Sequence, residues 1–391
     1  MKVVLVRHSY SPHGGAERYL DGLLRGLSSR GASVKLLTAS WEGGASGAVS
    51  IETIRVPGKP APLRLLLFAK EVRSWSRSHP DWLLFSLERI PGAEVYRAGD
   101  GCHVEWIRRK RALGRVAWPL EWVRPLNRTY LALERAMFRS PRLRAVIANS
   151  GRGKEDIVRH FAVPAGRIAV VYNGVDASAF PPEDRPAAVR ALRARFGVRD
   201  GETVFLFVGS GFARKGVGAL VDATVRLARR GAPFRVIVVG KGNAASYLRA
   251  ARRGGAEGRI LFPGPVAGAR DFFLGADAFV FPTLYEPFSN ACLEAMAAGL
   301  PVVTTTVNGA SEVLRDGESG YVLDDPLDAD ALADRMERLL SPDRRGAMGA
   351  AARRAAETLT PERNVSETMA VLSRAWEEKT GSGGEAPRGV V

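Results

Sequence analysis

The chain has 391 residues, of which 46% are hydrophobic and 25% are charged. This length is too great for one compact domain, and the composition is that of a folded globular protein. The formal net charge of +16 predicts an anionic partner, such as nucleic acid, anionic lipid or a phosphorylated substrate, without choosing among them. The two cysteines, Cys102 and Cys292, lack metal-ligand spacing, which favours a reducing compartment and argues against a structural zinc site.

The N-terminal stretch MKVVLVRHSY contains only a short apolar run. This run is too short for a secretory signal, and no stretch reaches the ~20 apolar residues of a membrane helix. We therefore expect a cytoplasmic protein whose contact with a membrane is peripheral.

In the first half, short apolar runs alternate with amphipathic stretches, the pattern of parallel strands joined by helices. Between the first two runs, four leucines share one helix face and Gly31 marks the end of that helix. The predicted strands are residues 2–6, 33–39, 51–56, 81–87 and 145–149.

A second series of strands follows at residues 203–209, 234–240, 259–264, 278–282 and 301–306. Both halves therefore predict doubly wound α/β domains, with sites at the C-terminal ends of their strands. The predicted divisions are a first domain at 1–176, a second at 177–360, a last helix at 361–378 and a disordered tail at 379–391.

The first strand is followed by HSYSPHGGAER, in which Gly14 and Gly15 directly precede a helix. Paired glycines let the backbone approach a ligand, and a helix N-terminus presents free N–H groups to an anion. Taken alone, these two glycines favour an ordinary turn. A dinucleotide fingerprint is absent, because the stretch has no G-x-G-x-x-G pattern.

The equivalent turn of the second domain, VGSGFARKGVGAL, places Arg214 and Lys215 where a helix begins. Two cations at a helix N-terminus oppose the helix dipole unless an anion lies between them. We therefore favour a phosphate-binding loop over a solvated basic loop. The spacing of a P-loop ATPase is absent.

The segment PTLYEPFSNACLEAMAAGLPVV carries Glu286 on a loop and Glu294 on the helix that follows. Ser289 and Asn290 can cap this helix and leave its first amides facing an anion. Carboxylates bind paired sugar hydroxyls, although Glu294 alone could simply favour the helix dipole. Together with the basic loop, these residues predict a nucleotide-sugar site.

At this point the sequence resembles a known family, the retaining glycosyltransferases of family 4. Glu286 and Glu294 match the family's E-x7-E motif, and VVYNGVD and VGSGFARKG resemble its interdomain and diphosphate-binding segments. The resemblance implies the GT-B fold, with an acceptor-binding first domain, a nucleotide-sugar-binding second domain and a C-terminal helix that returns to the first. The stretches SWEGG, GSGFARKGV and HGGAER further resemble the glucosyltransferases that act on the lipopolysaccharide core.

The resemblance also implies roles for single residues. Arg214 and Lys215 would hold the diphosphate of UDP-glucose, assisted by the segment of Phe288, Ser289 and Asn290. Glu294 would bind the ribose, Glu286 the donor sugar, and Gly14 and Gly15 would close over the donor. One departure is Ser210, where many members have arginine. The family retains the anomeric configuration without a strong nucleophile, and we expect no metal or other cofactor.

The acceptor side is less defined by the sequence. The stretch YRAGDGCHVEW corresponds to the family's residues near the reacting carbon, with Asp100 preferred over His103, which is as readily a core or surface histidine. Trp41 and Glu42 are candidates for an acceptor site, and Trp41 is equally compatible with simple packing. The implied acceptor is a lipid-linked saccharide, the inner-core heptose of lipopolysaccharide.

Residues 103–128 combine a strong excess of basic residues with three tryptophans. Arginine and lysine interleaved with tryptophan suit an anionic membrane surface, although a solvated helix pair with buried tryptophans is the alternative. We expect binding to the cytoplasmic face of the inner membrane through Arg108, Arg109, Lys110, Arg111, Trp118 and Trp122.

Other functions remain open at this level. A nucleotide-sugar epimerase of the same fold, or a family-4 transferase with another donor or acceptor, fits the same motifs. A nucleic-acid binder would fit the charge of +16, but the sequence shows no recognition motif, so nucleic acid is not expected as a partner.

Overall fold

The structure is a computed structural model that describes residues 1–10, 15–41, 50–57, 60–112, 121 and 123–381. The chain forms two compact units, one made of Met1–Tyr172 and the C-terminal residues from Glu362, the other of Asn173–Pro361. The first boundary lies between residues 172 and 173, near the predicted division at 176/177. The predicted disordered tail begins at residue 379, whereas helix α14 (Pro361–Gly381) continues to Gly381, and residues 382–391 lie outside the described residues.

In the described part of the first unit, parallel strands form a sheet of order β5-β3-β1-β6-β7-β8-β9. Two short strands, β2 and β4, form a separate parallel pair; β2 follows β1 in sequence, and β4 follows β3. The strands are Lys2–Val6 (β1), Ser9–Tyr10 (β2), Ser33–Thr38 (β3), Ser40–Trp41 (β4), Ser50–Thr53 (β5), Leu83–Ser86 (β6), Val95–Arg97 (β7), Ala145–Ala148 (β8) and Ile168–Val170 (β9).

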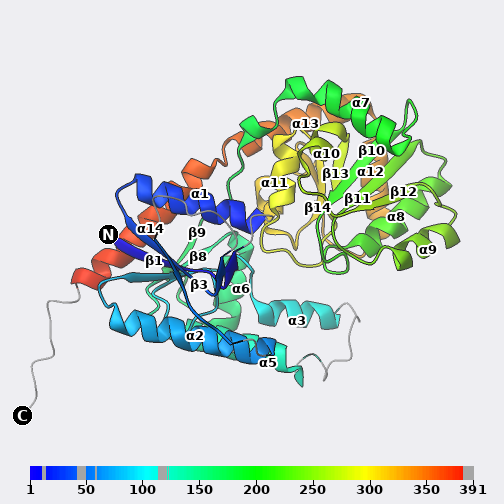
Figure 1. The fold of residues 1–391 in the computed structure, drawn as a ribbon. Coiled ribbons are helices and arrows are strands. Elements are labelled where there is room, and N and C mark those ends of the chain that lie inside the picture. Colours follow the sequence, from blue (N-terminus) through cyan, green and yellow to red (C-terminus); the bar gives the residue numbers. More distant parts are fainter. Residues whose placement is uncertain (11–14, 42–49, 58–59, 113–120, 122, 382–391) are drawn as a thin grey trace, which may run out of the picture. The chain divides into compact units, whose positions relative to one another are not determined.

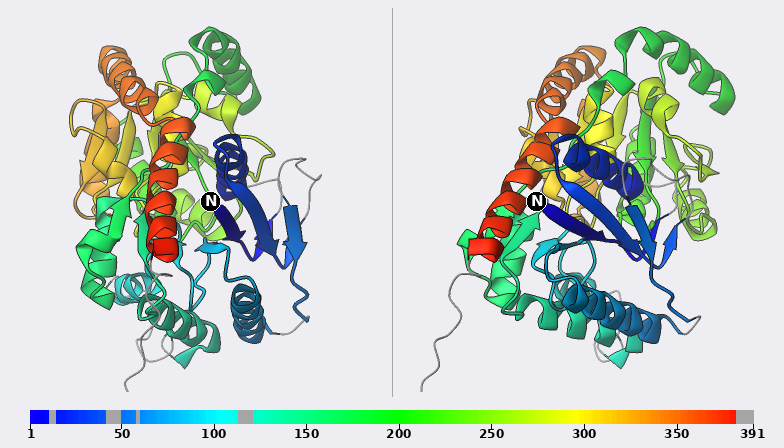
Figure 2. Two further views of the ribbon diagram at one scale, coloured as in Figure 1. Left: turned by 90° about the vertical axis from the view of Figure 1, so that its left-hand side faces the viewer. Right: turned by 60° about the vertical axis from the view of Figure 1, so that its left-hand side comes forward.

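Helices cover both faces of this sheet (Figures 1 and 2). Successive side chains of β1 point to opposite faces. Val3 and Leu5 pack with α1 and α14, while Val4 and Val6 pack with α2 and α5. The helices of this unit are Gly15–Ser29 (α1), Ala61–Ser78 (α2), His103–Ala112 (α3), Pro125–Phe138 (α5), Gly151–Phe161 (α6) and Pro361–Gly381 (α14), with a 3-10 turn at Ala165–Arg167 (η1).

The last helix, α14, belongs to the core of the first unit. Its apolar face contributes buried side chains to the same cluster as α1 and β1. A methyl group added at Gly26 of α1 would lie 2.6 Å from Val365, so the two helices touch closely. At the other end, the Lys379 ammonium donates hydrogen bonds to Glu94 at 2.8 Å and to the Trp82 carbonyl at 2.7 Å. These contacts fix α14 along its length.

The second unit is a parallel sheet of order β12-β11-β10-β13-β14-β15 among its described residues. Its strands are Thr203–Val208 (β10), Phe234–Val239 (β11), Ile260–Gly264 (β12), Ala278–Val280 (β13), Val302–Thr305 (β14) and Gly320–Leu323 (β15). Its helices are Arg185–Phe196 (α7), Val217–Arg229 (α8), Ala245–Arg253 (α9), Arg270–Gly275 (α10), Asn290–Ala297 (α11), Ala329–Arg338 (α12) and Pro342–Glu357 (α13), with 3-10 turns at Ala177–Ala179 (η2), Pro182–Asp184 (η3) and Gly309–Val313 (η4).

This strand order makes β10 and β13 neighbours although two strands separate them in sequence. The chain first winds from β10 towards β12 and then returns to continue from β13 on the other side of β10. Such a reversal is the topological switch point of a doubly wound sheet, where ligands bind beyond the carboxyl ends of the strands. The structure therefore confirms the predicted class of two Rossmann-like α/β units.

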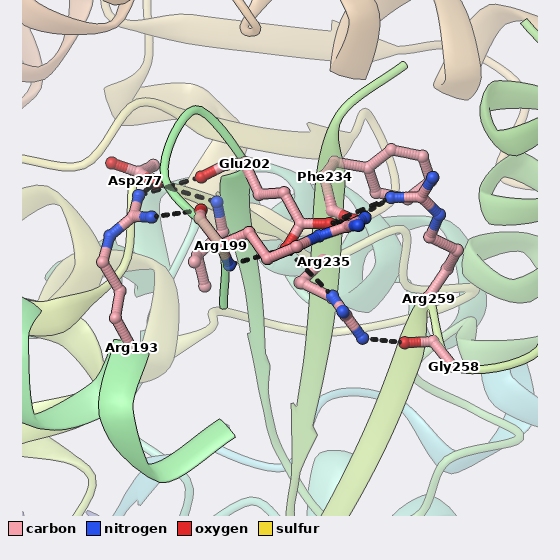
Figure 3. A network of polar contacts seen from close by, with 9 residues as sticks. Arg193, Arg199, Glu202, Phe234, Arg235, Gly258, Arg259 and Asp277 are labelled. Atoms are coloured by element: carbon pink, nitrogen blue, oxygen red, sulfur yellow. Dashed lines mark hydrogen bonds and ion pairs between the residues drawn. The ribbon is translucent and has the colours of Figure 1, made fainter. Parts of the chain in front are cut away.

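The opposite, amino-terminal edge of the second sheet is held by a cluster of charges (Figure 3). The Glu202 carboxylate is almost fully buried just before β10, and it bonds to Arg199 at 3.0 Å, Arg235 at 3.2 Å and Arg259 at 3.1 Å. Burial alone would raise the pKa of Glu202, but the hydrogen bonds from Arg199 and Arg235 outweigh it and the pKa is lowered. All partners of Glu202 lie at the amino-terminal edge of the second sheet, so the cluster stabilises the fold.

Replacing Glu202 by glutamine should lower the free energy of unfolding by about 2 kcal/mol at neutral pH, because charge-assisted hydrogen bonds are lost. Since the folded pKa lies below the unfolded one, this stabilisation is present at neutral pH and disappears as the pH falls through the folded value. Urea unfolding of Glu202→Gln at several pH values measures it. The matched control is Glu257→Gln, whose side chain is 69% exposed beside Arg252. Equal losses in both variants would contradict the structural role of Glu202.

Candidate functional site

Two loops meet at the switch point of the second unit, one after β10 and one after β13. The carbonyl of Arg214 in the first loop accepts hydrogen bonds from the amide of Leu284 at 2.9 Å and the hydroxyl of Thr283 at 3.2 Å. The guanidinium of Arg214 donates in turn to the Tyr285 carbonyl at 3.0 Å. These bonds join the two predicted ligand-binding segments into one surface.

Close contact of these loops depends on Gly216. Its φ is +79°, and a Cβ there would lie 1.7 Å from the carbonyl oxygen of Pro282. Both the backbone angle and the space therefore require glycine. Helix α8 begins at the next residue, Val217, so its N-terminus lies directly behind the basic loop.

The side chain of Glu286 lies between the two cations of the first loop. Its Oε2 is 3.2 Å from Arg214 Nη1 and 3.3 Å from Lys215 Nζ. The Lys215 ammonium also stands over the ring of Phe281, 5.0 Å from its centroid. Two positive charges against one negative charge leave this surface positive, which suits an anionic ligand such as a diphosphate.

The backbone of Glu286 is fixed from the next strand. Its amide donates to the Val307 carbonyl at 3.1 Å, and its carbonyl accepts from the Gly309 amide at 2.9 Å. Glu286 is bridged to Asn308 in parallel fashion by these bonds. A carboxylate held in this way, with 13% of its side chain exposed, has a defined position from which to bind a ligand.

Helix α11 begins within the second loop, and its start has the predicted cap. Ser289 is the N-cap, with its hydroxyl accepting from the Cys292 amide at 3.3 Å. The fully buried Asn308 side chain accepts a hydrogen bond from the Ser289 amide at 3.2 Å and donates one to the Thr304 hydroxyl at 2.9 Å. Asn308 therefore holds the start of α11, while its neighbours Val307 and Gly309 hold the backbone of Glu286. Sequence reasoning missed Asn308, although an asparagine between a buried strand and a glycine was a signal.

The remaining predicted donor residues also lie in this unit. Phe288 is buried and Glu294 lies half-buried on α11. Asn290 accepts a hydrogen bond from Asn173 at 2.6 Å. Ser210 is exposed at the end of β10, where its hydroxyl accepts from the Lys241 amide at 3.0 Å.

Both cysteines are buried thiols outside any disulfide. Cys292 lies beneath the site, and burial raises the pKa of its thiol to about 11. A neutral thiol is a poor nucleophile at physiological pH. Burial likewise raises the pKa of Cys102 in the first unit. Both cysteines are core residues.

In the first unit, Asp100 and His103 have different surroundings. Asp100 is exposed in the turn between β7 and α3. His103 is the first residue of α3, with its Nε2 3.1 Å from Asn127 Oδ1 and its ring centroid 5.0 Å from that of Tyr130. Burial lowers the pKa of His103, so the ring is neutral at pH 7. The structure therefore places His103 in a helix contact and leaves Asp100 accessible.

The other candidates of the first unit are only partly described. Gly15 begins α1, and Trp41 ends β4, where it packs against the core. Gly14, Glu42, Trp118 and Trp122 lie outside the described residues.

The basic residues of α3 divide into two groups. Arg108 and Arg111 are exposed. Arg109 pairs with the buried Glu105 at 2.8 Å, and Lys110 pairs with the buried carboxylate of Glu121. Two of the four predicted membrane cations are thus used in ion pairs within the unit. In the described parts of the chain, no helix is both long and apolar enough to cross a bilayer.

One group of side chains has the donor types of a metal site. The ligand atoms of Glu105, Asp156 and His160 lie within 4.8 Å of one another. His160 bonds to Glu105 at 2.8 Å, while Arg109 and Arg159 pair with the two carboxylates at 2.8 and 3.7 Å. These arginines already balance the negative charge, so a divalent cation would meet strong competition. The group joins α3 to α6.

Comparison with family models and known proteins shows which proteins this chain is similar to. A model described as Glycosyltransferase Family 4 matches residues 13–179, and one described as Glycosyl transferases group 1 matches residues 202–342. The lipopolysaccharide glucosyltransferase WaaG of Escherichia coli is 25% identical over 342 residues, covering 87% of this chain and 90% of WaaG. A D-inositol 3-phosphate glycosyltransferase of Xylanimonas cellulosilytica is 30% identical over 373 residues, covering 88% of this chain and 87% of that protein.

Solved structures show the same fold. The crystal structure of WaaG has a TM-score of 0.79 at 24% identity and covers 97% of this chain and 100% of that one. HepE of Anabaena, solved with UDP-glucose, has a TM-score of 0.72 at 20% identity and covers 96% of this chain and 100% of HepE. With two family models along its length and a relative of 30% identity over most of both chains, the protein is a glycosyltransferase of family 4 with the GT-B fold.

Proposed function

We propose that this enzyme transfers glucose from UDP-glucose, with retention of configuration, onto a lipid-linked saccharide, the inner-core heptose of lipopolysaccharide. The observation that carries the proposal is the positive surface at the switch point of the second unit, where Glu286 lies between Arg214 and Lys215. The name of the relative WaaG supports the acceptor, and HepE solved with UDP-glucose supports the donor.

In this proposal the diphosphate lies between the two cations and the start of α11. Arg214 and Lys215 offer charge-assisted hydrogen bonds, and the first amides of α11 face the same anion with the positive end of the helix dipole. Glu294, on α11, accepts hydrogen bonds from the ribose hydroxyls. Glu286 then exchanges its ion pairs for contacts with the hydroxyls of the glucose.

In this mechanism, positive charge stabilises the leaving group, and no side chain acts as a nucleophile. As the glycosidic bond to UDP breaks, negative charge grows on the leaving diphosphate, and Arg214 and Lys215 stabilise that charge where it develops. The acceptor hydroxyl attacks from the face that the diphosphate leaves, which retains the configuration. The two cations do the work that a metal does in other transferases, and we propose that the reaction needs none.

For the acceptor, Asp100 is the better of the two first-unit candidates. It is exposed at the carboxyl edge of the sheet, whereas the His103 ring is neutral and engaged by Asn127. The 30% identity to a D-inositol 3-phosphate glycosyltransferase favours a second acceptor class, a phosphorylated cyclitol. Assays with truncated lipopolysaccharide and with inositol phosphate, using one radiolabelled donor, separate the two.

We further propose that the first unit attaches to the cytoplasmic face of the inner membrane. Arg108 and Arg111 of α3 are exposed, and Val123 and Leu126, which lie just before and at the start of α5, are exposed large apolar side chains. Exposed arginine beside apolar side chains is what an anionic membrane surface binds.

The two glutamates should differ in their effects on donor binding. Glu294→Ala should weaken UDP about 10- to 100-fold, because it removes hydrogen bonds to a charged group. Glu286→Ala should leave UDP affinity unchanged or raise it, since Arg214 and Lys215 become fully available, while transfer falls by about 100-fold or more. Calorimetric titration with UDP and a transfer assay measure both.

The matched control for these variants is Glu318→Ala, which changes a carboxylate that is 57% exposed in the same unit. Its UDP affinity and transfer should equal those of the wild type. An equal loss of UDP affinity in the Glu286 and Glu294 variants would show that the assigned division between sugar and ribose is wrong.

Changing Arg108 and Arg111 together to serine should weaken binding to phosphatidylglycerol vesicles about 30-fold at low salt, at ~1 kcal/mol for each arginine. Vesicle sedimentation measures the effect. The control changes Arg252 and Arg315 of the second unit, whose side chains are 74% and 80% exposed. If both double variants bind as tightly as the wild type, the membrane does not contact α3.

A further inference from the structure

The first unit has a topological switch point of its own. Its sheet order places β3 and β5 on one side of β1 and β6 to β9 on the other. The reversal therefore lies between β1 and β6, and a ligand of this unit is expected beyond the carboxyl ends of these two strands. Arg7 and His8 follow β1 there, and Glu88 follows β6.

The backbone around Glu88 is held firmly. The Ser86 hydroxyl donates to the Glu88 carbonyl at 2.7 Å and accepts from the Glu88 amide at 3.0 Å. The amide of Leu87 continues the sheet with a bond to the Val6 carbonyl at 3.0 Å. The backbone that carries the Glu88 carboxylate is thus held at the carboxyl ends of β1 and β6.

The carboxylate itself is only partly satisfied. Its Oε1 accepts from the His8 amide at 3.1 Å and lies 3.4 Å from Arg7 Nη1, with 20% of the side chain exposed. Within the described residues, no hydrogen bond reaches its Oε2. A carboxylate oxygen without a partner can accept a hydrogen bond from a ligand hydroxyl.

A second unsatisfied atom belongs to His8, whose backbone amide contacts the Glu88 carboxylate. The Nε2 atom of His8 is buried and has no hydrogen-bond partner among the described residues. The ring packs edge-on against Phe68 at 4.9 Å, and the His8 carbonyl is fixed by the Ala39 amide at 3.0 Å. Burial, with the nearby Arg64 and Arg7, lowers the pKa of His8, so the ring is neutral and can exchange one hydrogen bond with a hydroxyl.

The surroundings of Glu88 do not stabilise its ionised form. Burial raises its pKa, Arg7 and Arg89 oppose the rise, and the carboxylate of Asp100 adds to it. The net rise means that the fold favours the protonated form and gains nothing from the ionised one. Groups that the fold disfavours in this way gather at functional sites.

We propose that Glu88, together with His8, binds hydroxyl groups of the acceptor sugar at the switch point of the first unit. This assignment rests on the proposed transfer to a saccharide and adds the residues that recognise it. Asp100 lies close enough to Glu88 to raise its pKa, so the same edge also carries the accessible carboxylate already assigned to the acceptor side.

The experiment compares Glu88→Gln with the wild type, using UDP-glucose and heptose-terminated truncated lipopolysaccharide. The KM for this acceptor should rise at least 10-fold, and UDP affinity by calorimetry should stay within 2-fold. Thermal unfolding should be unchanged or shifted upward, because glutamine removes a charge that the fold disfavours. The matched control is Glu367→Gln on α14, a surface carboxylate paired with Arg363, and it should match the wild type throughout.

The pH profile separates binding from a merely structural role. Below the raised pKa of Glu88 the carboxyl is protonated, so the wild-type acceptor KM should rise as the pH falls through that value. Glu88→Gln should lack this acid limb, and Glu88→Asp, which keeps the charge, should retain it. An unchanged KM and an unchanged acid limb in Glu88→Gln would overturn the assignment while leaving the transferase activity intact. A wild-type enzyme that binds UDP but never glucosylates this acceptor would contradict the proposed acceptor and the role of Glu88 together.

Discussion

The proposed donor site depends on the ion pairs that Glu286 makes with Arg214 and Lys215. These pairs join residues from two loops that the strand order brings to one point, and they hold like charges close together without a ligand. In the proposed function, a diphosphate would take over the same cations and leave the carboxylate to the sugar. The segment 307–309 holds the backbone of Glu286, and Gly216 lets the two loops touch.

The two edges of the second sheet show opposite uses of charge. At the amino edge, Glu202 is surrounded by arginines and its pKa is lowered, so the ionised form stabilises the fold. At the carboxyl edge, positive charge exceeds negative charge, and the surplus is available to an anionic ligand. In the first unit, Glu88 shows the same contrast, because its raised pKa indicates a carboxylate that the fold alone does not favour.

Much of this organisation could be predicted from the sequence, because apolar runs and capping residues act locally. The strand at Lys2–Val6 and the cap at Ser289 lie where the sequence placed them. The predictions missed β7, β9 and β15, although β13, which is equally short, was predicted from its apolar run. They also missed Asn308 and Glu88, whose importance comes from contacts with residues distant in sequence.

The central claim, that the switch point of the second unit binds a UDP-sugar, is tested most directly by thermal unfolding of the full chain with a panel of UDP- and GDP-sugars. A ligand that binds only the folded state raises the unfolding temperature with its concentration. The account predicts that UDP-glucose gives such a rise and that GDP-sugars give little. No shift with any nucleotide sugar at millimolar concentration would contradict it.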